Sequence, residues 1–155
     1  MKKSASELMK ELKIIKKEIE ELYYDDFTNG EFTVGMDSDY ESSYDYAANR
    51  QREQELREEE RKIKSVLNKF NNEQTVKGYS LTISEGLVIL AQLKAQIDHL
   101  QRMASKKEFS QSYSSTTMLG YKVKELNKTI KELTRQQNSL QIAIDHTNLT
   151  SSLEV

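Results

Sequence analysis

The stretch TISEGLVILAQLKAQIDHLQRMA, residues 82–104, decides the fold class of this chain. Its apolar side chains recur at steps of three and four, which is the spacing of one face of an α-helix. Further apolar residues beside this seam widen the stripe, as expected for a helix that contacts more than one neighbour. Thr82 and Glu85 form a capping box at its start. We therefore expect a helix at the centre of the core, with a seam of Ile83, Leu87, Leu90, Leu93, Ile97, Leu100 and Ala104.

Three more helices are predicted around this one. A capping box at Ser4 and Glu7 precedes a heptad seam, which predicts a helix over residues 4–24. A highly charged run predicts a helix over residues 45–71, whose first half faces solvent or packs on polar groups. Thr116 or Thr117 is expected to cap the last helix. The predicted fold is all-α, a single helical domain over residues 1–155: an elongated four-helix antiparallel bundle or packed coiled-coil hairpins, with helices over 4–24, 45–71, 82–106 and 117–147.

The composition favours self-association. Charged residues make up 31% of the chain and hydrophobic residues 36%, with no proline and no tryptophan. Each helix can then bury only a narrow apolar stripe, and a second copy of the chain is expected to complete the core. Gln137 takes an apolar position in the seam of the last helix, where a polar residue commonly fixes register or partner number. We therefore predict a homo-oligomer whose register depends on Gln137.

Residues 23–46 differ from the rest of the chain, with seven acids, five of the eight tyrosines and no lysine or arginine. Asn29-Gly30 predicts a small β-hairpin within the loop over residues 25–44. Two interpretations are open: this loop binds a protein partner with a basic surface, or it folds back through Phe27, Phe32 and Tyr24 to cover the end of the bundle. The candidate partner-binding residues are Tyr23, Tyr24, Asp25, Asp26, Phe32, Asp37, Asp39, Tyr40, Tyr44 and Tyr46.

The sequence offers no catalytic, cofactor-binding or metal-binding motif. It has no cysteine, and neither histidine, His99 or His146, has partners at the spacing of a metal site. Calcium-loop registers begun at Asp25 or Asp37 lack the required glycine or glutamate. No serine elbow or glycine-rich phosphate loop is present. The chain is predicted not to be an enzyme, and Asp37, Asp39 and Glu41 are interpreted as a solvated loop, with an adventitious divalent-cation site as the alternative.

Charge and hydropathy patterns bear on location and partners. No run of about 18 apolar residues occurs, so neither a membrane span nor a secretion signal is expected, and we predict a cytoplasmic protein. The net charge is −2, and lysines alternate with glutamates at helical spacing. This pattern is typical of solvated helix faces, so no nucleic-acid partner is expected.

The second half of the chain resembles a known family. LNKFNNEQTVKGYSLTISEGLVILAQLKAQIDHLQRMA, residues 67–104, and VKELNKTIKELTRQQNSLQIAIDHTNLTSSLEV, residues 123–155, are similar to the connector and the last two helices of the septicolysin-like family of small bacterial helical proteins. The resemblance is best over residues 67–155. It implies a four-helix architecture and self-association, and it implies no particular activity.

Several functional hypotheses follow from these patterns. The first is a non-enzymatic cytoplasmic helical-bundle protein that self-associates and acts as a scaffold or protein-interaction module. The alternative is an accessory or regulatory subunit of a bacterial toxin or phage-defence system. A membrane-active cytolysin, suggested by the family name, is disfavoured because the sequence contains no amphipathic hairpin long enough to insert into a bilayer.

Overall fold

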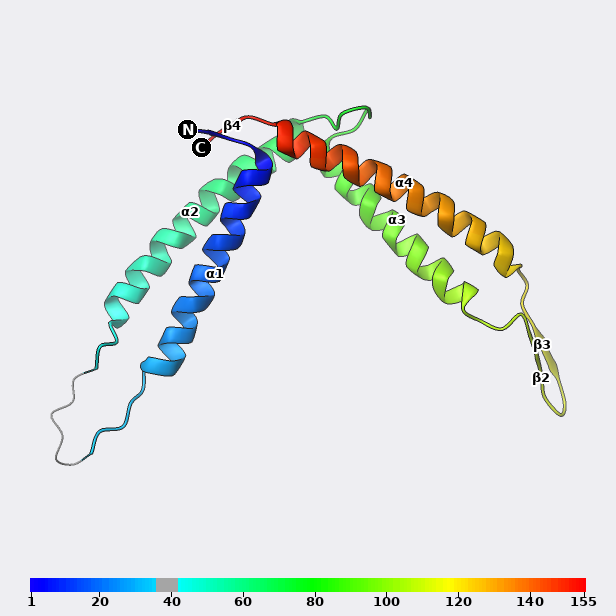
Figure 1. The fold of residues 1–155 in the computed structure, drawn as a ribbon, viewed down its shortest axis with the longest axis horizontal. Coiled ribbons are helices and arrows are strands. Elements are labelled where there is room, and N and C mark those ends of the chain that lie inside the picture. Colours follow the sequence, from blue (N-terminus) through cyan, green and yellow to red (C-terminus); the bar gives the residue numbers. More distant parts are fainter. Residues whose placement is uncertain (36–41) are drawn as a thin grey trace. The chain divides into compact units, whose positions relative to one another are not determined.

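The computed structural model describes residues 1–35 and 42–155. Within these residues the chain is all-α, with four helices and short antiparallel strand pairs, which confirms the predicted fold class (Figure 1). The chain divides into two compact units. Unit 1 comprises Met1–Phe70 and Asn148–Val155, and unit 2 comprises Asn71–Thr147.

Unit 1 is a helical hairpin in which α1 (Ala5–Asn29) lies beside α2 (Tyr46–Glu73) (Figure 1). The predicted capping box starts α1: the Ser4 hydroxyl accepts from the Glu7 amide at 3.2 Å, and the Glu7 carboxylate accepts from the Ser4 amide at 2.7 Å. Strand β1 (Lys2–Lys3) pairs antiparallel with β4 (Leu153–Glu154). The core of unit 1 consists of Ala5, Leu8, Ile15, Ile19, Leu56, Ile63, Leu67 and Phe70.

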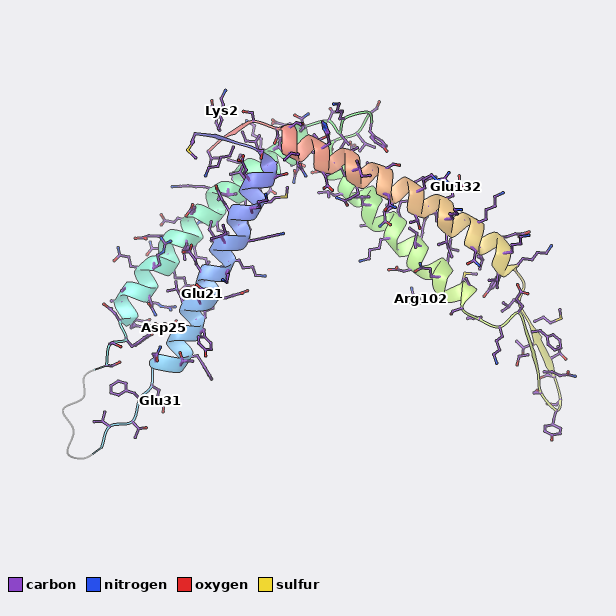
Figure 2. All side chains as sticks on the ribbon, viewed as in Figure 1. Lys2, Glu21, Asp25, Glu31, Arg102 and Glu132 are labelled. Carbon is purple, nitrogen blue, oxygen red and sulfur yellow. The ribbon has the colours of Figure 1, made fainter. Side chains whose placement is uncertain are left out.

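The first half of α2 packs on α1 through polar side chains, as its sequence predicts. Arg52 donates to Glu18 of α1 at 2.8 Å, and Arg57 donates to the hydroxyl of Tyr23 at 2.8 Å. Figure 2 shows polar side chains projecting along the whole length of both helices of this unit. Apolar burial in α2 begins at Leu56 and continues through the second half of the helix.

Unit 2 is a second helical hairpin, formed by α3 (Ile83–Ala104) and α4 (Val123–Thr150). The predicted capping box is present, with the Glu85 carboxylate accepting from the Thr82 amide at 2.7 Å. Gly86 marks the close approach of the two helices, because a Cβ atom there would lie 2.9 Å from Cδ1 of Ile144. The core of unit 2 consists of Val76, Ile83, Leu90, Ile97, Leu140 and Ile144.

The connector between α2 and α3 is folded rather than extended. Val76 is fully buried, and its amide donates to the carbonyl of Leu81 at 2.9 Å. Gly78 adopts a φ of 84°, a left-handed conformation that glycine reaches without steric cost. The Lys77 amide donates to the hydroxyl of Thr147 at 3.1 Å. This turn holds Tyr79 and Leu81 beside α3 and α4.

The prediction of a β-hairpin at Asn29-Gly30 is wrong, because this segment is helical and the hairpin forms elsewhere in the chain. Phe27, Thr28 and Asn29 continue α1, and the Gly30 amide closes its last turn by donating to the carbonyl of Asp26 at 3.2 Å. Gly30 has a φ of −69°, so the left-handed turn that Asn-Gly favours does not form. The β-hairpin of this chain instead joins α3 to α4, through β2 (Phe109–Gln111) and β3 (Thr116–Met118).

The predicted start of the last helix is also wrong. Thr116 and Thr117 do not cap a helix, because they pair with Gln111 and Ser110 in the hairpin. α4 begins at Val123 and continues past the predicted end at residue 147 to Thr150. The other predicted bounds agree more closely: α2 and α3 begin and end within a few residues of 45–71 and 82–106, and α1 extends beyond residue 24.

Candidate functional site

Asp26, near the end of α1, is the centre of a polar cluster that joins α1 to the start of α2. One carboxylate oxygen accepts from the hydroxyl of Tyr44 at 2.7 Å and from the side-chain amide of Asn49 at 3.1 Å. The other oxygen pairs with the guanidinium of Arg50. The neighbouring Asp25 accepts from the same Asn49 amide at 2.8 Å. These contacts join residues from α1, the segment before α2, and α2 itself.

Arg50 extends this cluster along α2. Its guanidinium donates to Glu53 at 2.6 Å and lies over two tyrosine rings, 5.4 Å from the centroid of Tyr46 and 6.0 Å from that of Tyr23. Both distances are within the range of cation–π attraction. The hydroxyl of Tyr23 donates in turn to Glu53. We call this set the polar cluster: Tyr23, Asp25, Asp26, Tyr44, Tyr46, Asn49, Arg50 and Glu53.

The hydrogen bonds of the polar cluster shift the pKa values of its members. The Tyr44 hydroxyl, the Asn49 amide and the Arg50 charge stabilise the Asp26 carboxylate, which lowers its pKa. The same hydrogen bond, with burial and the Asp26 charge, raises the pKa of Tyr44 to about 12. Hydrogen bonds from Asn29 and Asn49 lower the pKa of Asp25. At neutral pH the cluster therefore holds ionised aspartates against a neutral phenol.

The structure divides the sequence-predicted partner-binding residues into groups. Tyr23, Asp25, Asp26 and Tyr44 direct their polar groups toward their own chain. Phe32 and Tyr46 are about half and two-thirds exposed. Their role in binding a partner stays a prediction. Asp37, Asp39 and Tyr40 lie outside the described residues, as does Glu41 of the alternative cation site.

Within the described residues, Phe27 and Tyr24 are not buried against the end of unit 1. Phe27 is 87% exposed and Tyr24 is 71% exposed, so these rings contribute little to a core. The anchor of this segment is Tyr44, and it acts through its hydroxyl rather than through apolar burial. The sequence reasoning named Phe27, Phe32 and Tyr24 for this contact and did not assign it to Tyr44.

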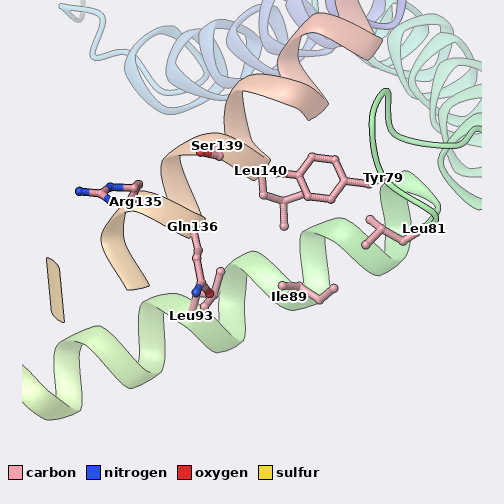
Figure 3. Close-up of a pocket in the computed structure, with 8 residues that line it drawn as sticks. All are labelled: Tyr79, Leu81, Ile89, Leu93, Arg135, Gln136, Ser139 and Leu140. Carbon is pink, nitrogen blue, oxygen red and sulfur yellow. The ribbon is translucent and has the colours of Figure 1, made fainter. Parts of the chain in front are cut away.

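A second surface feature lies in unit 2, between α3 and α4. Two adjoining hollows of about 420 and 360 Å³ share Leu81 and Ile89. Figure 3 shows the residues that line the larger hollow, and Arg135 points away from the others. We call this feature the apolar groove. It is lined by Tyr79, Leu81, Val88, Ile89, Leu93 and Leu140, with Glu85, Arg135, Gln136 and Ser139 at its rim.

Gln137 is half-buried in α4, between the half-buried Leu133 and the buried Leu140. Its position on the seam of the helix hairpin agrees with the heptad spacing. Its effect on register or oligomer number stays a prediction.

Sequence reasoning missed several of these features. Asn49, Arg50 and Glu53 were interpreted only as part of a charged helix, although Arg50 and Glu53 have the i,i+3 spacing of an ion pair. The apolar groove had a partial signal in Val88 and Ile89, which lie beside the heptad seam. The pairing of β1 with β4 has no periodicity signal, because each strand has only two residues.

Within residues 1–35 and 42–155, no group of three or more His, Asp or Glu side chains could hold a metal ion. Among the helices of these residues, none combines the length and the apolar character that a bilayer span requires. No family model matches the chain, and no curated protein or solved structure shows significant similarity to it. The resemblance to the septicolysin-like family therefore stays a prediction.

Proposed function

We propose that this chain is a non-enzymatic helical protein that self-associates and acts as a scaffold or protein-interaction module. The observation that supports this function is the apolar groove of unit 2. It lies on the helix pair whose seam is the most apolar in the sequence, and its wall residue Val88 and the adjacent Leu87 are 57% and 45% exposed.

The groove has the properties of a surface that a second copy covers. The floor carries aliphatic side chains and one tyrosine. Removing such apolar surface from water stabilises an assembly by about 25 cal/mol per Å². A second copy carries the same groove, so a two-fold contact brings two matching apolar surfaces together.

The charges at the rim of the groove fit this two-fold arrangement. Glu85 lines the smaller hollow with Ser80 and Leu81, whereas Arg135 lines the larger hollow, on the side away from Leu81 (Figure 3). A two-fold axis through the middle of the groove places the Glu85 end of one copy over the Arg135 end of the other, and the Arg135 side chain turns toward Glu85 on assembly. Opposite charges then meet at both ends, which favours this register over one that aligns like charges.

The test replaces Ile89, which both hollows share, with lysine. In the two-fold contact the lysines of the two copies lie close together and repel each other, so I89K is expected to lose this contact and to have a lower molar mass than the wild-type chain. The control is A91K, because Ala91 is exposed on the same helix and does not line the groove. Light scattering measures the molar mass of each variant, and circular dichroism checks that its helix content is unchanged.

The wild-type chain and A91K are expected to share a mass above that of the monomer. An I89K variant that retains helix content and has the mass of the wild-type chain would contradict the groove as the contact surface.

A further inference from the structure

The β2–β3 hairpin has an outer edge whose backbone groups face away from its partner strand. The Ser112 amide donates to the Ser115 carbonyl at 2.8 Å, and the Leu119 amide donates to the Glu108 carbonyl at 3.2 Å. Hydrogen-bonded and non-hydrogen-bonded pairs alternate along an antiparallel ladder. Phe109 and Gln111 therefore occupy non-hydrogen-bonded positions of β2, and their amides and carbonyls point outward from the hairpin.

This edge lacks the features that usually protect a strand from pairing with another chain. Exposed edges are commonly blocked by charged side chains, by proline or by a bulge. Residues 109–121 contain no charged residue and no proline, and the pairing of β2 with β3 is continuous in register. All residues of both strands are exposed, and a two-stranded hairpin alone is only marginally stable. Figure 2 shows the hairpin side chains projecting freely on both sides.

We propose that the β2 edge is a self-pairing surface, on which β2 of a second copy adds antiparallel to form a continuous sheet from two hairpins. This contact uses a different surface from the apolar groove and does not depend on it. The pairing has a defined register, with Ser110 of each copy at the two-fold axis. Phe109 of one copy then faces Gln111 of the other, and each such pair exchanges both of its outward backbone hydrogen bonds.

The charges beside the hairpin fit antiparallel self-pairing. Lys106 and Lys107 lie at the base of the hairpin, and its tip, residues 112–115, is uncharged. In the antiparallel register each base lies beside the tip of the other copy, so the lysines of the two copies stay apart. The fully exposed ring of Tyr113 then lies near Lys107 of the other copy, where a cation–π contact can form. Parallel pairing would place the lysines of the two copies side by side.

The apolar side chains of the hairpin also fit this arrangement. Phe109 and Met118 are cross-strand partners on one face, and they are 57% and 72% exposed. Self-pairing places the same two side chains of the second copy on the same face of the enlarged sheet. Cross-strand pairs of this kind are the main stabilising contacts of small sheets. The second copy therefore supplies both backbone partners and apolar neighbours.

Cysteine cross-linking tests the register, because the chain has no cysteine of its own. At the two-fold axis the two Ser110 residues form a non-hydrogen-bonded pair, whose Cα atoms are about 4.5 Å apart, within the range of a disulfide. Mild oxidation of S110C is expected to convert most of the protein to a covalent dimer. The matched control is T117C, because Thr117 is the cross-strand partner of Ser110, is equally exposed, and lies away from the β2 edge. It is expected to remain monomeric on denaturing gels.

Equal yields of covalent dimer from S110C and T117C, or no dimer from S110C, would overturn the proposal. Proline variants give a second test in the S110C background. Q111P removes an outward amide of β2 and is expected to abolish cross-linking, whereas T116P removes an outward amide of β3 and is expected to leave it unchanged. The opposite pattern would assign the contact to the β3 edge and overturn the assignment to β2. Circular dichroism checks that both proline variants fold.

The strand contact and the groove contact fail in distinguishable ways. S110C is expected to cross-link in the I89K background as well, because the two surfaces are separate. An unchanged mass on I89K substitution, together with cross-linking through S110C, would contradict the groove and support the strand contact. A chain whose mass falls on I89K substitution but whose S110C variant does not cross-link would support the groove and contradict the strand contact.

Discussion

At the scale of single residues, the structure changes the interpretation of Asp26 most. In the sequence it belongs to an acidic, tyrosine-rich stretch that suggests an edge for a basic partner. In the structure its partners are Tyr44 and Arg50 of the same chain, 18 and 24 residues away. This role could not be predicted from the sequence, because it depends on how far α1 extends and on its register against α2. Local patterns contain neither quantity.

Y44F tests whether the polar cluster stabilises unit 1. The substitution keeps the ring and removes the hydroxyl that donates to Asp26, so the midpoint of thermal unfolding is expected to fall by roughly 2–5 °C at pH 7. Y46F is the control, because the Tyr46 ring stays beneath Arg50 and the 64% exposed residue has no comparable hydrogen bond to a carboxylate. Thermal unfolding monitored by circular dichroism measures the midpoint of each variant. Equal midpoints for Y44F and the wild-type chain would show that the hydrogen bond from Tyr44 to Asp26 adds no stability.

The polar cluster contributes to the free energy of unfolding, and the pKa shifts of its members determine how this contribution changes with pH. The folded-state pKa of Asp26 is lowered, so its contribution is present above the ordinary aspartate pKa and is lost as the pH falls through the lowered value. The pKa of Tyr44 is raised to about 12, so its contribution is present below the ordinary value of 10.0 and is lost as the pH rises through about 12. The difference between Y44F and the wild-type chain is therefore expected to be largest between these limits and to shrink in acid.

At the scale of elements, the features that depend on a few neighbouring residues were predictable. Both capping boxes, Ser4 with Glu7 and Thr82 with Glu85, are present because each needs only one helical turn. The turn at Asn29-Gly30 was predicted wrongly, because the helix continues through Asn29 and the Asn29 side chain donates to Asp25 one turn earlier. The β2–β3 segment carries no pattern that separates a strand from a loop, since short uncharged runs of serine and threonine favour both.

Gln137 gives a prediction at the element scale. It is half-buried on the seam of α4, so Q137L is expected to replace a polar group with an apolar contact and raise the unfolding midpoint by roughly 2–4 °C, with a change in oligomer size if this position fixes register. Q141L is the matched control, because Gln141 is exposed on the same helix. Thermal melts and light scattering provide the comparison. The same effect from both substitutions would show that the Gln137 position is no more buried than the surface.

At the scale of the whole molecule, self-association depends on surfaces that the described chain does not cover. The apolar groove and the β2 edge each present groups that a second copy can match by two-fold symmetry. Their positions follow from tertiary structure: the groove needs the folded connector of Tyr79 and Leu81, and the edge needs the hairpin register. The sequence predicted self-association from its narrow apolar stripes, but it could not locate the contacts.

The most direct test of self-association is the molar mass of the wild-type chain in solution, measured by light scattering over a dilution series in the micromolar range. Self-association predicts a molar mass of at least twice the 18.0 kDa of one chain at the upper end of the series, falling toward that value on dilution. A mass of 18.0 kDa at every concentration would contradict it.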